Sequence, residues 1–269
     1  MMMNNLKRII TTFLFSCLII SATVAQEKIN ASGVFPDVAM VANHYPRTES
    51  GTGALMPWAN HLWAITYVAH TKTTGSGTGL YKIDKDFNLV QHPQSVVGTY
   101  ANRMVHSQSQ QLIMGPHFID TLGNVRVVED LVDHRLTATM VHLTDPANKV
   151  YFLSMEGIFF EVDVNTLETK ELYDLTKELD MPEKSKPHFK SGFTAYNKVV
   201  VANNTYDGRD YSGRWQAGRL AEWDGETWTV IDENPYTEVW CSNSFSRPMI
   251  ATGWDNKSVI LKVFLGKEW

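Results

Sequence analysis

Short apolar runs recur along this chain at intervals of about 40 to 45 residues, and each is followed by a turn and further strand-like segments. Four of the runs read LWAITYVAH, QLIMGPH, KVYFLSMEG and KVVVANN, and they end at or beside His70, His117, Glu156 and Asn203. A second repeated segment precedes three of these runs, and its copies align on Met56, Met104 and Met140. Repeated groups of four short strands are typical of the blades of a β-propeller, which removes exposed sheet edges by closing into a ring.

The strand pattern therefore predicts an all-β chain built from four-stranded antiparallel blades. We place the first blade at about 38–96 and end the second, third and fourth near 133, 180 and 236. A fifth begins near Trp240, in WCSNSFSRPMIATGWDNKSVILKVF. The predicted propeller domain spans 38–269 and contains about five visible blades.

The N-terminal segment has the pattern of a signal peptide. Lys7 and Arg8 precede the apolar run 9–20, and small residues follow in SATVAQ, which places a cleavage site after Ala25. The run is short for a membrane span of about 20 residues. We assign 1–25 to a signal peptide and 26–37 to a linker, and we expect export to the periplasm or the cell exterior without a membrane span. The mature chain then keeps one cysteine, Cys241, so an internal disulfide cannot form.

Composition narrows the range of partners. The chain has 269 residues, of which 43% are hydrophobic, and this is enough apolar material for a sizeable core. Its net charge is −5, so no basic field indicates nucleic acid as a partner. An acidic oligosaccharide or polysaccharide is still compatible, because a locally basic cleft can exist in a mildly acidic protein. We expect a monomer.

Two histidines, His106 and His117, flank one apolar run but are expected to lie on opposite faces of the ring. In a blade, the innermost strand runs from one face to the other and the next strand returns. His106 stands where the inner strand ends, whereas His117 follows the returning strand. His106 and His142 share a position two residues after the echoed methionines, which favours hydrogen-bonded structural histidines. A channel metal held by both is the alternative.

The face that carries His117 is predicted to collect polar side chains from the ends of the second strands and the starts of the inner strands. The candidates are His70, His117, Asn203, Tyr100, Asn102, Arg135, His188 and Lys190. His134 competes with its neighbour Arg135 for one role. Histidine, arginine, lysine and tyrosine converging on one concave mouth are typical of a binding or catalytic site.

Such a mouth suits β-elimination at a 4-linked uronic acid. The reaction needs a cation that neutralises the carboxylate, a base that removes the C5 proton and an acid that assists the leaving oxygen. Arginine pairs bidentately with carboxylates, and histidine can serve as base or acid near neutral pH. The chemistry requires no cofactor.

Several segments resemble the propeller domain of L-rhamnose-α-1,4-D-glucuronate lyases, which are similar in layout to propeller ulvan lyases. The segments include GALMPWANHLWAITYVAH, VVGTYANRMVH, QLIMGPHFID, RLTATMVHLTDPANKVYFLSMEG and HFKSGFTAYNKVVVANNTYDG. The resemblance covers roughly 47–269 and is most specific over 53–157. It implies a seven-bladed ring, so about two blades would be missing and the chain would be an N-terminal fragment.

The resemblance also implies roles for individual residues. His70 falls on a family histidine, His117 on an acid/base position that is a tyrosine in related lyases, and Arg135 on the carboxylate-neutralising arginine. Two departures leave the base unassigned: Glu49 and Ser50 stand where a histidine is expected, and His188 with Lys190 stand where a second arginine is expected. A structural calcium ion in the central channel would fit the family, with ligands that the sequence does not identify.

The sequence thus predicts an exported lyase that cleaves L-rhamnose-α-1,4-D-glucuronate linkages in arabinogalactan side chains such as those of gum arabic. Its catalytic residues would be His70, His117 and Arg135, with His188, Lys190, Asn203, Tyr100 and Asn102 binding the substrate. The alternative is a non-catalytic propeller that binds carbohydrate or acts as a scaffold. Which histidine is the acid and which is the base stays open.

Overall fold

The computed structural model describes residues 50–68, 78–182, 186–205, 218–241, 248–255 and 257–269. All of them belong to one compact unit of the chain, Pro36–Trp269. The predicted signal peptide, the predicted linker and the candidate His70 lie outside the described residues. Within the described residues, strands dominate and only two short helical turns interrupt them.

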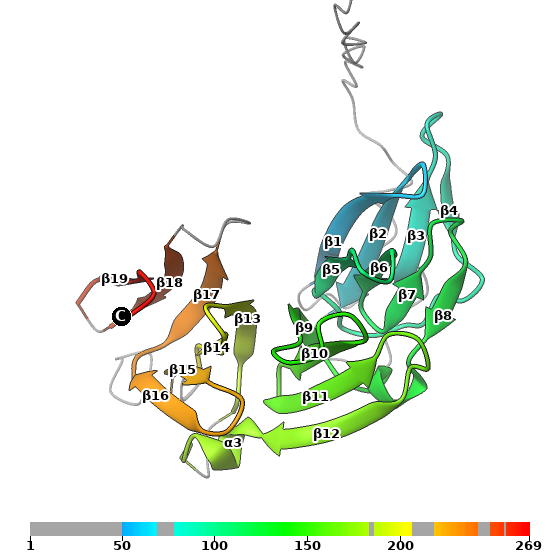
Figure 1. The fold of residues 1–269 in the computed structure, drawn as a ribbon. Coiled ribbons are helices and arrows are strands. Elements are labelled where there is room, and N and C mark those ends of the chain that lie inside the picture. The colour runs from blue at the N-terminus through cyan, green and yellow to red at the C-terminus, as the bar shows by residue number, and fades with distance from the viewer. Residues whose placement is uncertain (1–49, 69–77, 183–185, 206–217, 242–247, 256) are drawn as a thin grey trace, which may run out of the picture. The chain divides into compact units, whose positions relative to one another are not determined.

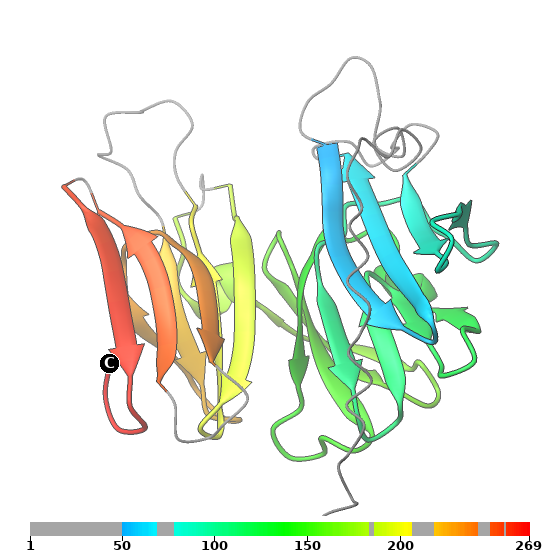
Figure 2. The same cartoon turned by 90° about the horizontal axis from the view of Figure 1, so that it is seen from above.

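The described strands form five antiparallel sheets, and the strands of each sheet lie side by side in chain order (Figures 1 and 2). The first sheet contains β1 (Ser50–Trp58), β2 (His61–Val68), β3 (Gly79–Ile83) and β4 (Leu89–Gln91). The second contains β5 (Arg103–His106), β6 (Gln111–Met114), β7 (His117–Ile119) and β8 (Val125–Val127). The third contains β9 (Leu136–Val141), β10 (Lys149–Ser154), β11 (Ile158–Asp163) and β12 (Thr169–Asp174).

The fourth sheet contains β13 (Phe189–Ala195), β14 (Lys198–Asn203), β15 (Arg219–Trp223) and β16 (Trp228–Asp232). The fifth contains β17 (Tyr236–Cys241), β18 (Met249–Trp254) and β19 (Val259–Phe264). A 3-10 turn, η1 (Glu129–Leu131), follows the second sheet and a one-turn helix, α3 (Leu175–Glu178), follows the third. The predicted four-stranded blades are confirmed for four sheets, whereas the fifth has three described strands and begins at Tyr236 rather than near Trp240.

The core lies between consecutive sheets, because alternate residues of a strand face opposite sides of its sheet. In the third sheet, Phe152 and Phe160 pack with residues of the first and second sheets. Their strand neighbours Tyr151 and Phe159 pack instead with the fourth sheet. A further cluster joins the fourth and fifth sheets through residues such as Val200. Each large buried side chain contributes about 1.5–3 kcal/mol, so these clusters stabilise the stacking of the sheets.

Aspartates close the turns between the third and fourth strands of four sheets. In each turn the carboxylate accepts the backbone N–H two residues later, and the aspartates are Asp84, Asp120, Asp163 and Asp224. Hydrogen bonds from Thr166 and Asn165 hold the pKa of the Asp163 carboxyl below its usual range. An aspartate that satisfies backbone donors in this way favours a tight turn at that position. The strand-like runs that end in Asp in the sequence thus mark these turns.

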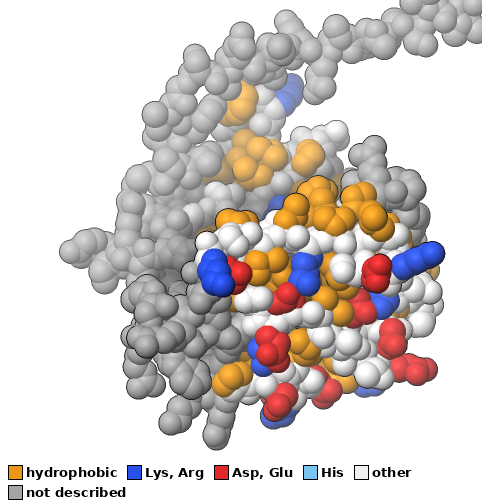
Figure 3. Space-filling model, turned by 90° about the vertical axis from the view of Figure 1, so that its left-hand side faces the viewer, with side chains coloured by type: hydrophobic (Ala, Val, Ile, Leu, Met, Phe, Trp, Pro, Cys, Tyr) orange, Lys and Arg blue, Asp and Glu red, His pale blue; other side chains and the backbone are white. Residues whose placement is uncertain are grey.

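The fifth sheet has one covered side and one exposed side. Val239 and Ala251 pack against the fourth sheet. On the other side, Trp240, Leu261 and Val259 are 47%, 63% and 81% exposed. Figure 3, which views the side on which β18 and β19 lie in Figure 1, shows hydrophobic side chains at the surface among charged ones. This side of the fifth sheet therefore exposes several large apolar side chains within the described part of the chain.

Candidate functional site

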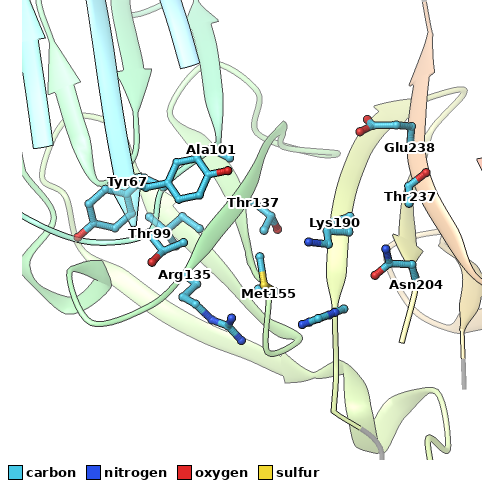
Figure 4. Close-up of a pocket in the computed structure, with 13 residues that line it drawn as sticks. Tyr67, Thr99, Ala101, Arg135, Thr137, Met155, Lys190, Asn204, Thr237 and Glu238 are labelled. Carbon is cyan, nitrogen blue, oxygen red and sulfur yellow. The ribbon is translucent and has the colours of Figure 1, made fainter. Parts of the chain in front are cut away.

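A pocket of 410 Å³ lies at the end of the sheets where the inner strands, the first strand of each sheet, begin (Figure 4). Its volume is in the range of about 300–1,000 Å³ that is usual for ligand sites. The lining residues are Tyr67, Thr99, Tyr100, Ala101, Arg135, Leu136, Thr137, Met155, His188, Lys190, Asn204, Thr237 and Glu238. Every one of the five sheets, or a segment next to it, contributes to the lining.

A repeated β-bulge builds the pocket wall. Near the start of three inner strands the pairing register skips one residue, and the skipped residues are Thr137 in β9, Lys190 in β13 and Thr237 in β17. A bulge bends the strand and re-aims its side chains, and bulges are common next to functional sites. All three bulged residues line the pocket. The same local irregularity therefore directs a side chain from each of three sheets into one space.

A buried residue anchors each of these strand starts. The residue immediately before each bulge is fully buried, and these residues are Leu136, Phe189 and Tyr236. Tyr100 has the same position in the segment before the second sheet, and it pairs with Leu136 through an isolated bridge. Because side chains alternate along a strand, the neighbours of a buried anchor face the other way. This explains why Arg135 and Thr137, and also His188 and Lys190, line the pocket in pairs.

Arg135 is the best-positioned cation in the pocket. Its Nε–H donates to Oε1 of Glu156 at 2.5 Å, and its side chain is 26% exposed. The two terminal amino groups of the guanidinium form no hydrogen bond with any described residue. In Figure 4 the guanidinium extends into the space between the strands. Glu156 thus holds the side chain in place while the terminal N–H groups stay available to an anion.

His188 and Lys190 come from the start of the fourth sheet. The backbone of His188 is fixed on both sides: its N–H donates to Thr205 Oγ1 at 2.9 Å, and its carbonyl accepts the Asn204 N–H at 3.1 Å. The Lys190 side chain has no ion-pair or hydrogen-bond partner among the described residues, and Figure 4 shows its amino group directed into the pocket. Arg135 and Lys190 together give one part of the pocket a positive character, and His188 lies beside them.

The prediction that His117 lies at the mouth is wrong. Its side chain is fully buried, Nδ1–H donates to the Met114 carbonyl at 3.0 Å and Nε2 accepts the Val96 N–H at 3.2 Å. Burial lowers the pKa of the ring to about 4. His117 is therefore a neutral imidazole that ties the turn after β6 to the segment that precedes the second sheet, and it does not line the pocket.

Three predicted substrate-binding residues also prove to be mainly structural. Asn102 is buried and donates to the Gly115 carbonyl at 3.0 Å and to Thr139 Oγ1 at 2.7 Å. The Asn203 side chain is buried and accepts the Thr205 N–H at 2.6 Å. Tyr100 lines the pocket, but its hydroxyl donates inward to the Val132 carbonyl at 2.7 Å. Asn102 and Asn203 are therefore not among the lining residues, because their side chains bond to neighbouring segments, whereas Tyr100 does line the pocket with its hydroxyl engaged elsewhere.

The separation of the two histidines is confirmed. His106 ends β5 and pairs with Gln111 across the turn, whereas His117 pairs with Met114 at the other end of β6. His106 Nε2–H donates to the Pro146 carbonyl at 2.9 Å, and Nδ1 lies 2.7 Å from Ser109 Oγ. His142 likewise bonds Glu161 at 2.8 Å. The reading of both as hydrogen-bonded structural histidines is confirmed.

Sequence reasoning missed several pocket residues, of which Glu238 is the only acidic one among the described lining residues. The residue is exposed, yet partial desolvation by its surroundings raises the pKa of its carboxyl, against the opposing effect of Arg103 and Lys190. Thr137 and Thr237 add hydroxyl groups. The sequence contains a pattern that identifies Glu238, Thr137 and Thr237, since each lies one or two residues after a large apolar residue that begins an inner strand. This pattern is useful only when the first residue of each inner strand is known.

No helix among the described residues has the length and apolar character that a membrane crossing would need. The described residues also contain no group of three or more His, Cys, Asp or Glu side chains arranged to hold a metal ion.

Comparisons with known proteins bear on the fold. No protein-family model matches the chain, and no curated protein matches it. Among solved structures, the extracellular domain of a hybrid two-component system from B. thetaiotaomicron matches with a TM-score of 0.50 at 9% identity. The match covers 80% of this chain and 30% of that one, so the chain spans less than a third of that structure's length.

Two further matches carry propeller names. The WD40 domain of Neurospora crassa Pan2 has a TM-score of 0.43 at 13% identity, covering 88% of this chain and 66% of that one. The β-propeller domain of Myceliophteria thermophila Cps50 has a TM-score of 0.38 at 11% identity, covering 83% and 74%. At such identities the likeness concerns the fold alone. The succession of antiparallel sheets, each of consecutive strands and packed on the next, defines an all-β protein of the β-propeller class.

Proposed function

We propose that the pocket binds a uronic acid unit and that the protein is an exported polysaccharide lyase acting on L-rhamnose-α-1,4-D-glucuronate linkages. The observation that carries the proposal is the convergence of Arg135, His188 and Lys190 on one pocket with hydroxyl-bearing neighbours. Three nitrogen-bearing side chains around a polar cavity suit an anionic ligand, and threonine hydroxyls suit a sugar. Export is proposed from the signal-peptide pattern.

Arg135 is proposed to neutralise the uronate carboxylate. Its terminal N–H groups can form the two parallel hydrogen bonds that a carboxylate accepts, while Glu156 holds Nε. Pairing of the carboxylate with a cation lowers the cost of charge that develops on it when the C5 proton leaves. Lys190 adds a second positive charge in the same pocket.

The proton transfers need a revised assignment. His117 is buried with both ring nitrogens engaged, so it takes no part in the proposal. His188 lines the pocket and replaces it as a candidate for one proton transfer, and His70 is kept for the other from the family resemblance. The base accepts the C5 proton, the electron pair of the C5–H bond forms the C4–C5 double bond as the C4–O bond breaks, and the acid donates its own proton to the leaving oxygen. No cofactor is part of this scheme, and no step uses the calcium that the resemblance implies.

The test is incubation of the protein with gum arabic while ultraviolet absorbance is followed in the band of unsaturated uronates. We expect a gain for the wild type and its loss in Arg135→Ala, with both proteins showing the same thermal unfolding. Glu226→Gln, an exposed change in the β15–β16 turn, is the matched surface control. No gain with a folded wild-type protein would refute the lyase proposal.

A second candidate is a propeller that binds acidic carbohydrate without cleaving it. The burial of His117 favours it, because that removes one of the expected acid/base groups from the pocket. Binding of glucuronate-bearing oligosaccharides that is lost in Arg135→Ala, without any gain in absorbance, would support this candidate over the lyase.

A further inference from the structure

A carboxylate shares the pocket with the cations. Glu238 lies in β17, two residues after the buried anchor Tyr236, and lines the same cavity as Arg135 and Lys190. Its side chain forms no hydrogen bond or ion pair with any described residue, while its backbone pairs with Thr252 of β18. Glu238 is exposed and also lines the pocket, so a ligand that covers it must replace the water around its carboxylate with hydrogen-bond donors of its own.

The negative side chain of the pocket and the Arg135 guanidinium lie at opposite ends of it. In Figure 4, Glu238 lies with Thr237 on β17 at one end of the pocket, and Arg135 lies at the other end, with Lys190 between them. Arg103 and Lys190 are the cations close enough to influence the Glu238 carboxyl. The pocket therefore offers an anion site around Arg135 and an acceptor-only site around Glu238.

Such polarity selects between ligands. Sugar hydroxyls donate hydrogen bonds and can satisfy a carboxylate acceptor, which offsets the loss of its water. A second ligand carboxylate at the same position would instead be repelled, and unfavourable contacts of this kind are an efficient source of specificity. A ligand that carries one carboxylate at one end and only hydroxyls at the other fits in a single direction.

We infer that Glu238 is a specificity-determining residue that makes the pocket select a uronate whose neighbouring sugar unit is uncharged, and that it fixes the direction in which the pair binds. The inference rests on the proposed function, because it takes the Arg135 end as the carboxylate site. The proposed function already contains the uncharged unit, L-rhamnose; the inference adds the residue that distinguishes it from a charged one.

The experiment compares two disaccharides of equal length by equilibrium binding. One has a neutral sugar linked to glucuronate, and the other has two linked glucuronates. For wild type we expect the neutral-capped ligand to bind at least about tenfold more tightly, and we expect Glu238→Gln to reduce this ratio about tenfold. Glu226→Gln removes the same charge from an exposed turn outside the pocket and should leave the ratio unchanged.

A salt titration of the wild type gives a readout that needs no substitution. The preference should shrink as salt is added, because screening weakens repulsion between solvent-accessible charges. Equal binding of the two ligands to wild type, or an unchanged ratio in folded Glu238→Gln, overturns this inference while leaving the uronate site standing. Failure of both ligands to bind overturns the proposed function and the inference together.

Discussion

The turn after β6 and the turn after β10 occupy equivalent places in the second and third sheets. The polar residue that follows β6 is buried, whereas the one that follows β10 is exposed to solvent. After β6, two residues, Gly115 and Pro116, lead directly to β7, so that His117 is already a strand residue paired with Met114. After β10, three residues precede β11, and Glu156 stands in the turn itself. His117 is fully buried, whereas the Glu156 side chain is 40% exposed and holds Arg135.

The difference shows that position along a repeat determines the end of a sheet at which a residue lies, but not whether solvent reaches it. One residue more or less in a turn moves a side chain between the strand and the loop. On the third sheet the outcome is a charged pair at a pocket, and on the second it is a sealed hydrogen-bonded imidazole. Four substitutions test this contrast.

The largest effect is expected from Arg135→Ala, which removes the cation that the exposed Glu156 holds. If Arg135 stabilises charge that develops on the uronate, turnover should fall by roughly 10²–10³ with a smaller change in KM. Rates of absorbance gain on gum arabic measure this effect. A folded Arg135→Ala protein that keeps wild-type turnover would show that the pair with Glu156 is structural only.

His117→Gln replaces the buried imidazole of this comparison and should lower the stability of the folded protein. The folded chain protonates His117 near pH 4, whereas an unfolded histidine has a pKa near 6.5. The unfolded state therefore binds more protons between these values, and stability falls as the pH falls from about 6.5 to 4, by roughly 3 kcal/mol in total.

We expect His117→Gln to be less stable than wild type at pH 7 and to show a shallower loss of stability between pH 6.5 and 4. Urea unfolding at several pH values measures both. The pKa values of His92 and His106 are also lowered by burial, and they contribute to the slope in both proteins, so the difference isolates His117. Equal slopes in the two proteins would contradict the assignment of a buried neutral ring.

His106→Ala tests a histidine at the opposite end of the second sheet, away from the pocket. The substitution removes the hydrogen bonds to Pro146 and Ser109 and should cost about 1–3 kcal/mol of unfolding free energy. Turnover per folded molecule should not change, because the ring lies at the end of the sheet away from the pocket. Loss of turnover at full folding would reverse our assignment of faces.

The smallest effect is expected from Asp163→Ala, in the β11–β12 turn. The carboxylate accepts the N–H groups of Asn165 and Thr166, and losing these bonds should cost about 1 kcal/mol at neutral pH. Because its folded pKa lies below the ordinary value of 3.8, this contribution is present above that pH and is lost as the pH falls below it. Thermal unfolding at pH 7 and pH 3 checks the difference.

Much of the fold could be predicted from the sequence. The echoed methionines Met104 and Met140 lie in inner strands, as expected, and the runs around Ile113 and Phe152 form the second strands. These predictions succeed because apolar periodicity reports directly on the two sides of a strand. The fifth sheet was placed a few residues late, since no echoed methionine marks its start at Tyr236.

The candidate site was predicted less well. Arg135, His188 and Lys190 were correctly expected at one face, because the starts of inner strands meet there. Glu238 was missed because its strand boundary was misplaced, and Asn102 and Asn203 were included although their side chains bond to the interior. A polar residue beside a strand end can either line the pocket or hydrogen-bond to the interior, and the neighbouring residues in the sequence do not distinguish the two.

By itself, the sequence determined the all-β class, the repeat length, the order of the strands and the end of each sheet at which a polar residue lies. These properties depend on local periodicity and turn chemistry, which are written in consecutive residues. Only the tertiary structure decided that His117 is sealed, that Arg135 is held by Glu156 and that Glu238 faces the same pocket from another sheet. Burial and charge pairing depend on segments far apart in the chain, and their effects appear only when the sheets pack together.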